Sequence, residues 1–292
     1  MYTMRRSTDA DIPRERELWR MSFGDDWDYI DTYYDHTHDP DWCVVLEDEA
    51  GVVQTMLIGF PVQQTLPDGA QIPAIYYYAL GTDPAVRGRG YGRALFRYAE
   101  AVFSGEGRPV MTLLPGEPSL YDFFLSIGYD DRNFFIRRLE TSRADLPAPE
   151  GAAEPAGPAE YNALRERYLA GSYHLSFDDA YLRHQKNVAR LYRGDLLRLA
   201  FSDTDGCASV EYAGGGTLLV KELLVPAGRT TAALAAIAER FPCENLVANL
   251  PAMPGFDELG SLAPYGVTHW MDSEQEALLS GRRDGYLGLA LD

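Results

Sequence analysis

Short apolar runs alternate with amphipathic segments along the chain. Residues 2–7 predict a strand, and the segments 8–23 and 25–35 place apolar side chains such as Leu18 and Ile30 at helical spacing. Later runs rich in β-branched and aromatic residues predict strands, and longer amphipathic runs predict helices. In the first half of the chain we expect strands over 42–47, 52–65, 72–82, 110–114 and 133–140, and helices over 91–103 and 119–127.

A second series of elements follows a segment rich in proline and glycine. Residues 141–158 cannot continue a helix or a strand ladder at that density, so we expect a linker there. A length of 292 residues suits two units, and we expect an α/β fold with units at 1–140 and 159–292, each a mixed sheet with flanking helices. In the second unit we expect helices over 159–170, 177–189 and 230–241, and strands over 196–202, 207–213, 218–225, 246–250 and 286–291.

The most specific motif lies between an expected strand and an expected helix. It reads Arg-Gly-Arg-Gly-Tyr-Gly over residues 87–92. Glycine tolerates positive φ, so successive amides can turn into one concavity, and the helix adds its unpaired N–H groups and positive dipole end. Such a loop can bind a pyrophosphate. A nucleotide P-loop does not fit because lysine is missing, and the dinucleotide fingerprint needs another glycine spacing. The alternative is a glycine-rich turn that binds nothing.

This motif resembles the signature Q/R-x-x-G-x-G/A of the GNAT superfamily of acyl-CoA-dependent N-acyltransferases, here Arg87-x-x-Gly90-x-Gly92. The order of elements over about residues 1–140 is similar as well. The resemblance implies that acetyl-CoA or a relative is the co-substrate, with its pyrophosphate on the loop amides and its pantetheine arm along Leu80 and Thr82. The residues it implies for the coenzyme are Leu80, Gly81, Thr82, Arg87, Gly88, Arg89, Gly90, Tyr91, Gly92, Arg93 and Ser119.

The second unit has no matching loop. At the equivalent place stands Val-Pro-Ala-Gly-Arg-Thr over residues 225–230, with one glycine, and a single glycine cannot form the same concavity. We therefore expect a tandem GNAT fold whose second copy is degenerate and binds no coenzyme A. This layout is similar to that of mycothiol synthase and of the enhanced-intracellular-survival acetyltransferases.

Acyl transfer to an amine needs donors for the oxyanion and a proton for the leaving thiolate. We expect the backbone N–H of Leu80 as oxyanion donor, at a bulge that Gly81 makes easy. The family places an acid, a tyrosine, where this chain has Phe124, which cannot donate. Tyr121, one helical turn earlier, is our candidate acid; the alternative is that it is a core aromatic.

An aspartate-rich segment lies where the family forms its acceptor site, which favours a cationic acceptor. No single carboxylate stands out as the general base, although analogy with the enhanced-intracellular-survival enzymes makes the C-terminal carboxylate of Asp292 a candidate. His36 and His38 have a spacing that could bind metal, but we expect none. The aspartates of the segment are Asp25, Asp26, Asp28, Asp31 and Asp35.

Composition narrows the partners further. A net charge of −18 argues against a nucleic-acid surface, and no apolar run reaches the length of a membrane helix. Three scattered cysteines suggest neither a disulfide framework nor a thiolate metal site. The N-terminus has no apolar signal core, so we expect a cytoplasmic protein.

The sequence therefore predicts an N-acetyltransferase. We expect it to move an acetyl or other acyl group from acetyl-CoA to a primary amine of a small molecule or peptide by direct attack, without a metal. The alternative is a non-catalytic acyl-CoA-binding sensor or scaffold protein, a reading that Phe124 supports.

Overall fold

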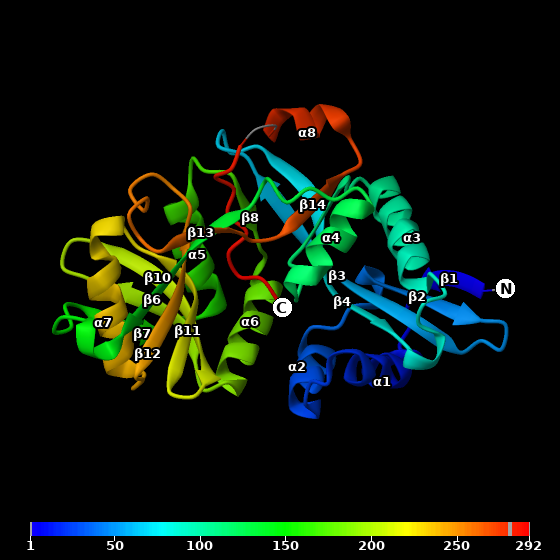
Figure 1. The fold of residues 1–292 in the computed structure, drawn as a ribbon, viewed down its shortest axis with the longest axis horizontal. Helices are drawn as coiled ribbons and strands as arrows, with labels where there is room; N and C mark the ends of the chain where they lie inside the picture. The colour runs from blue at the N-terminus through cyan, green and yellow to red at the C-terminus, as the bar shows by residue number, and fades with distance from the viewer. Residues whose placement is uncertain (1, 280–281, 292) are drawn as a thin grey trace.

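The computed structural model describes residues 2–279 and 282–291, which form two mixed β-sheets with helices on their faces (Figure 1). The apolar runs of the sequence form the central strands, because a strand covered on both faces must be apolar along most of its length. The two longest are β3 (Val53–Thr65) and β4 (Gln71–Thr82), and most of their side chains are buried. The predicted mixed α/β fold is confirmed.

The first sheet has the strand order β1-β2-β3-β4-β5-β14, and β8 joins it by pairing with β3. Its neighbouring strands are antiparallel except β4 and β5, which are parallel and linked through helix α3. Its further strands are β1 (Tyr2–Arg6), β2 (Cys43–Asp48), β5 (Val110–Leu113), β8 (His174–Ser176) and β14 (Val267–Trp270).

Helices cover both faces of this sheet and make two separate cores. The buried side chains of α1 and α2 belong to one apolar cluster, and those of α3 and α4 belong to another on the opposite face. Figure 1 shows α1 and α2 together on one side of β3 and β4, with α3 and α4 on the other. The four helices are α1 (Ile12–Phe23), α2 (Trp27–His36), α3 (Tyr91–Gly105) and α4 (Pro118–Ser126).

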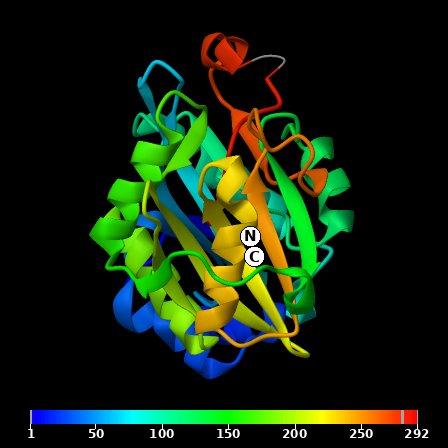
Figure 2. The same cartoon turned by 90° about the vertical axis from the view of Figure 1, so that its left-hand side faces the viewer.

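The second sheet has the order β13-β6-β12-β11-β10-β9-β7. Helix α7 (Thr230–Arg240) packs on one face, in front of the strands in Figure 2, while α5 (Pro158–Leu169) and α6 (Asp179–Leu191) lie between this sheet and the first. Its strands are β6 (Phe135–Ser142), β7 (Ala152–Pro155), β9 (Asp195–Ala200), β10 (Asp205–Gly214), β11 (Thr217–Leu224), β12 (Asn245–Pro251) and β13 (Ser261–Pro264).

Each sheet contains strands from both halves of the chain, and β8 from the C-terminal half pairs with β3 of the first sheet. β6, which we expected to end the first sheet, pairs with β12 of the second, and β14 from the C-terminal half pairs with β5 of the first. The alternation of apolar residues predicts that β6 is a strand but does not determine its partner. The predicted units at 1–140 and 159–292 stay a prediction, since each sheet takes a strand from both sides of that boundary.

Two expectations about the chain ends and the linker are wrong. Ala152–Pro155 within the expected linker forms β7, because an edge strand tolerates proline. The expected terminal strand over 286–291 is absent from the described residues, where only Gly285 and Tyr286 make isolated bridges. The sequence pattern also missed the short strands β8, β13 and β14 and helix α8 (Ser273–Leu279).

The C-terminal segment instead runs as an extended chain between the two halves (Figure 1). Tyr181 donates to the carbonyl of Leu289, and the Tyr76 hydroxyl bonds to both the N–H and the carbonyl of Leu291. The segment thus ends against β4. Asp292, the candidate base, lies outside the described residues. Within residues 2–279 and 282–291, none of the helices has the length and apolar character needed to cross a membrane.

Candidate active site

The glycine loop between β4 and α3 has the geometry of an anion site. Gly88 and Gly90 both adopt left-handed backbone, with φ of 78° and 79°, and Gly90 caps the N-terminus of α3. The amides of Tyr91, Gly92 and Arg93 lie in the first turn of α3, where a helix has no internal acceptor for them. Gly88 and Gly90 are exposed, and a Cβ added at either position would meet no atom within 4 Å. These amides can therefore converge on a phosphate.

Ion pairs and hydrogen bonds fix the start of this loop. Asp83 accepts from the Ala85 N–H at 2.8 Å and pairs with Arg14 of α1 at 2.5 Å. Arg87 folds back and donates from Nε to the carbonyl of Thr82 at 3.1 Å, which ties the loop to the end of β4. Arg87 therefore holds the loop in place and also adds a positive charge to it.

Other arginines of the loop and of α3 remain exposed. Arg89, Arg93 and Arg97 are exposed, and among the described residues no carboxylate forms an ion pair with them. They lie within and just after the glycine loop, on the surface that a phosphate would approach. In a protein of net charge −18 this is a local concentration of positive charge that suits an anionic ligand.

Beside the loop, β4 and β5 separate. They pair only from Ala74 to Tyr76, although β4 continues to Thr82. On its other edge β4 stays paired with β3, and the Asp83 N–H donates to Gln54 across that pair. Because hydrogen-bonded and non-bonded positions alternate in an antiparallel pair, the polar backbone groups of Leu80 and Thr82 point away from β3, into the gap.

An apolar pocket of about 200 Å³ lies in this gap. It brings together the end of α1, strands β3, β4 and β5, the turn after β5, and helices α3 and α4. Its apolar lining and the free backbone groups of Leu80 and Thr82 beside it suit the pantetheine arm and the acyl group of an acyl-CoA. The lining residues are Phe23, Leu57, Tyr77, Tyr78, Leu80, Phe96, Leu113, Leu114, Pro115, Gly116, Leu120, Phe123 and Phe124.

The expected bulge is present but is not at Gly81. Gly81 pairs regularly with Met56, whereas Tyr78 and Ala79 together face Ile58 of β3. A side chain at Gly81 would instead crowd α1, since its Cβ would lie 3.2 Å from the Leu18 carbonyl. The extra residue turns the chain just before Leu80, whose N–H faces the gap where an oxyanion would form.

The predicted acid does not face this pocket. Tyr121 is half-buried, and its hydroxyl accepts from the Gly266 N–H at 3.2 Å, in the segment before β14. Burial raises the pKa of this phenol. Leu120, Phe123 and Phe124 are the α4 side chains that line the pocket. Its position therefore fits the alternative, a core aromatic, better than the predicted acid.

Ser119, included for the coenzyme, is exposed at the start of α4 and does not line the pocket. Its hydroxyl lies 3.4 Å from a carboxylate oxygen of Glu117. Sequence reasoning missed the pocket residues contributed by distant elements, namely Phe23 and Leu57, and the tyrosines Tyr77 and Tyr78. The run Tyr76-Tyr77-Tyr78 just before Leu80 was the one available signal.

Part of the aspartate-rich segment already has partners. Asp25 accepts from the indole N–H of Trp19 at 2.8 Å, and Asp31 pairs with Arg16. Asp26 is almost fully exposed and lies 3.5 Å from Arg20, and Asp28 is also exposed. Both carboxylates are exposed at the N-terminal end of α2, a few residues after Phe23 at the pocket. In the described part of the chain no group of three or more potential ligands is arranged to hold a metal ion.

The second sheet has a related β11–α7–β12 unit without the loop. Strand β11 ends at Leu224, and the 3-10 turn Ala227–Arg229 leads directly into α7. Gly228 does not have positive φ. The segment after β12 lies against the turn, since a Cβ added at Gly255 would lie 3.6 Å from the Ala227 Cβ. Phe256 of that segment is buried in the second core. The expected loss of the pyrophosphate loop in this copy agrees with this geometry.

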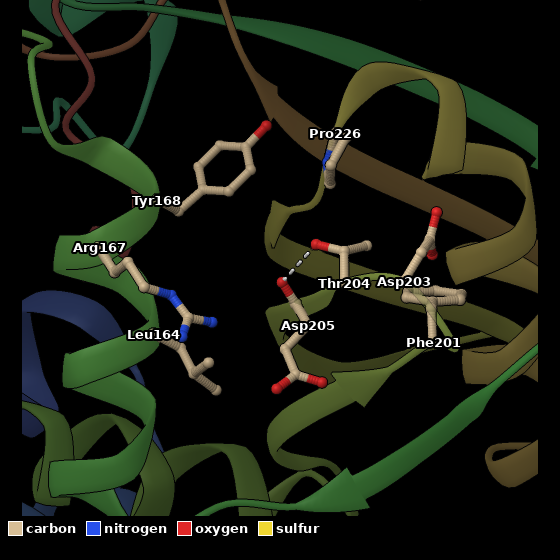
Figure 3. Close-up of a pocket in the computed structure, with 8 residues that line it drawn as sticks. All are labelled: Leu164, Arg167, Tyr168, Phe201, Asp203, Thr204, Asp205 and Pro226. Carbon is tan, nitrogen blue, oxygen red and sulfur yellow. Dashed lines mark hydrogen bonds between the residues drawn. The ribbon is translucent and has the colours of Figure 1, made fainter.

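A second hollow, of about 630 Å³, lies between α5 and the turn from β9 to β10 (Figure 3). The Arg167 guanidinium points into it. Its acidic side chains are already paired, Asp203 with Arg229 at 2.6 Å and Asp205 with Arg198 at 3.1 Å. We assign no chemistry to it. Its lining residues are Leu164, Arg167, Tyr168, Phe201, Asp203, Thr204, Asp205 and Pro226.

Comparison with known proteins places this architecture. Residues 3–130 match the model of the acetyltransferase (GNAT) domain. No curated protein is significantly similar to the chain in sequence. Among solved structures, a GCN5-related N-acetyltransferase from Anabaena variabilis superposes with a TM-score of 0.73 at 14% identity, over 94% of this chain and 74% of that one.

Two further structures share the two-sheet layout. The GCN5-related N-acetyltransferase from Kribbella flavida has a TM-score of 0.69 at 19% identity, over 94% of this chain and 73% of that one. Eis1 from Mycobacterium abscessus has a TM-score of 0.67 at 14% identity, over 96% and 76% of the two chains. Together with the gap between β4 and β5 and the glycine loop, these matches show that the chain has the tandem GNAT fold and that residues 3–130 form a GNAT acetyltransferase domain.

Proposed function

We propose that the protein transfers an acetyl or other acyl group from an acyl-CoA to a primary amine. The observation that carries this proposal is the continuity of the loop and the pocket. The left-handed Gly88 and Gly90 open an anion site at one end of the β4–β5 gap, and the apolar pocket occupies the other end. A coenzyme with a pyrophosphate, a pantetheine arm and a thioester has the matching order of groups.

In this reaction the chain positions the substrate and stabilises charge. The amides from Gly88 to Arg93 would hold the pyrophosphate, and the backbone of Leu80 and Thr82 would pair with the pantetheine arm. The Leu80 N–H beside the bulge would donate to the oxyanion that forms when the amine attacks the carbonyl carbon. Direct attack needs no covalent acyl-enzyme and no metal.

We further propose that the acceptor is cationic and approaches past the N-terminal end of α2. Asp26 and Asp28 are exposed there, and the chain carries a net charge of −18. A cleft with one sign of charge concentrates ions of the opposite sign. The acceptor itself is a small molecule or a peptide with a primary amine.

The test is release of free thiol from acetyl-CoA with a panel of amines: spermidine, phenylethylamine, glutamate and a lysine-containing peptide. Transfer predicts a rate that depends on the acceptor, with spermidine faster than glutamate. The alternative function, a sensor or scaffold that only binds acyl-CoA, predicts binding by calorimetry with no acceptor-dependent release. Gly90→Asp serves as the control that lacks the phosphate site.

A further inference from the structure

The proposed reaction needs a proton at the leaving sulfur, and the α4 side chains at the pocket cannot supply it. Leu120, Phe123 and Phe124 are all apolar, and the Tyr121 hydroxyl accepts a hydrogen bond from the Gly266 N–H. A thiolate is a moderately basic leaving group, since a thiol has a pKa of about 8.5, so a nearby donor speeds its departure. A proton donor must therefore come from another wall of the pocket.

Two phenols line the pocket, both on β4. The Tyr77 hydroxyl is buried and has no hydrogen-bond partner within the described residues, and the Tyr77 ring packs against Phe96 and Phe103 of α3. Tyr77 thus extends into the core beneath the helix. Tyr78 is only half-buried and belongs to the opposite face of the sheet. It also stands in the bulge, two residues before Leu80.

The position of Tyr78 combines the two requirements of a proton donor. Through the bulge it borders the gap in which the thioester would lie, next to the expected oxyanion N–H. Its hydroxyl is hydrogen-bonded to the hydroxyl of Tyr29 in α2. Tyr29 in turn contacts the ring of Tyr192, which is 42% exposed. The hydroxyls of Tyr78 and Tyr29 are therefore linked, and the ring of Tyr29 lies beside an exposed side chain just after α6.

The surroundings of Tyr78 keep its phenol neutral. The rings of Trp19, Phe60 and His184 lie around it, and burial raises its pKa well above that of a free tyrosine. Burial also lowers the pKa of His184 to about 3, so this neighbour carries no charge near neutral pH. The titratable groups that face Tyr78 are Asp25, Tyr29, Tyr33, Tyr181 and His184.

We propose that Tyr78 is the catalytic residue that protonates the leaving sulfur and that Tyr29 reprotonates it, an inference that rests on the proposed acyl transfer. The amine nitrogen bonds to the carbonyl carbon, the carbon–sulfur bond breaks, and the sulfur takes the Tyr78 hydroxyl proton. Tyr78 then takes the hydroxyl proton of Tyr29, and Tyr29 regains a proton from solvent. The amine nitrogen loses one proton to solvent when the amide forms. Thus amine and thioester give amide and thiol, with no proton gained or lost overall.

The test compares two acyl donors, one whose leaving thiolate needs a proton and one whose leaving thiolate does not. Tyr78→Phe keeps the ring and removes the hydroxyl, and the acceptor is the fastest amine of the panel. With acetyl-CoA, kcat should fall by about a hundredfold, a typical general-acid factor, while KM for acetyl-CoA stays unchanged. With S-(4-nitrophenyl) thioacetate, whose aromatic thiolate leaves without a proton, the rates of the variant and the unaltered protein should agree.

Two further variants complete the design. Tyr129→Phe removes another buried hydroxyl, bonded to Glu100 and outside the pocket, and should leave both rates unchanged. Tyr121→Phe tests the other candidate acid. If Tyr121→Phe lowers kcat with acetyl-CoA but not with the aryl thioester, and Tyr78→Phe does not, the proposal is overturned. If Tyr78→Phe lowers the rate equally with both thioesters, the proposal is also overturned, because that result would indicate a structural role. Failure of the proposed function looks different, since the unaltered protein would then bind acetyl-CoA and release no thiol with any amine.

Discussion

The guanidinium of Arg165 and the carboxylate of Glu222 lie 3.1 Å apart, and neither side chain has any exposed surface. The pair joins α5 to β11, and Arg165 also donates to the carbonyls of Leu175 and Leu287. Gly288 passes so close that a Cβ there would lie 2.3 Å from a Glu222 oxygen. The pair thus holds the C-terminal segment that runs between the two halves.

Replacing one partner of this pair should destabilise the protein strongly. Arg165→Met leaves the Glu222 charge buried without its partner, so the free energy of unfolding should fall by about 3–5 kcal/mol. The double variant Arg165→Met/Glu222→Leu should recover much of this loss, because no charge stays buried. Urea unfolding measures both variants. A single variant within about 1 kcal/mol of the unaltered protein would show that water reaches the pair.

The glycine loop predicts that each chain binds one coenzyme A and that the variant Gly90→Asp does not bind it. Gly90→Asp puts a side chain and a negative charge where the pyrophosphate would lie, so calorimetry should detect no binding of coenzyme A. Gly69→Asp is the matched control, since Gly69 also has positive φ, at 86°, and open space around it, in the turn between β3 and β4. It should carry the same backbone strain and still bind one coenzyme A. Two sites per chain, or binding to Gly90→Asp, would contradict the assignment of the loop.

Glu15 predicts a dependence of stability on pH. Its side chain is fully buried in α1, and burial raises its pKa from the ordinary value of 4.5 to about 7. Between these values the folded chain holds a proton that the unfolded chain has lost, so stability falls as pH rises through this window. Above pH 7 the cost is fully present, at about 3 kcal/mol.

Glu15→Gln cannot ionise, so it should be more stable than the unaltered protein at pH 8 and similar to it at pH 5. Glu17→Gln on the exposed side of α1 is the control and should show no such difference. Urea unfolding at the two pH values measures the effect. If the two Gln variants respond alike, Glu15 is not the group that titrates.

The proposed cationic acceptor predicts different effects at the two ends of α2. Asp26→Asn should lower kcat/KM for spermidine, because this carboxylate lies at the end nearest the pocket. Asp35→Asn removes another exposed charge, from the far end of the helix, and should have a smaller effect. The difference should shrink as salt is added, since the Debye length falls to about 8 Å near physiological ionic strength. Equal effects, or none, would mean that α2 simply presents a solvated acidic face.

The sequence alone determined most of the local elements and the anion loop. The long, mostly apolar runs defined β3 and β4, because burial on both faces requires them, and the glycines at 88 and 90 specified a turn that other residues cannot adopt without strain. The absence of this loop after β11 was equally readable. These features depend on neighbouring residues only.

Only the tertiary structure decided which strands pair and which side chains meet at the pocket. β6 and β14 exchange sheets, and a strand's own pattern does not name its partner. Helical spacing predicts that Tyr121 lies near the face of Phe124, yet the N–H of Gly266, just before β14, donates to its hydroxyl. Tyr78 gained its place from the bulge opposite Ile58, a shift of one residue that arises only when two strands lie side by side.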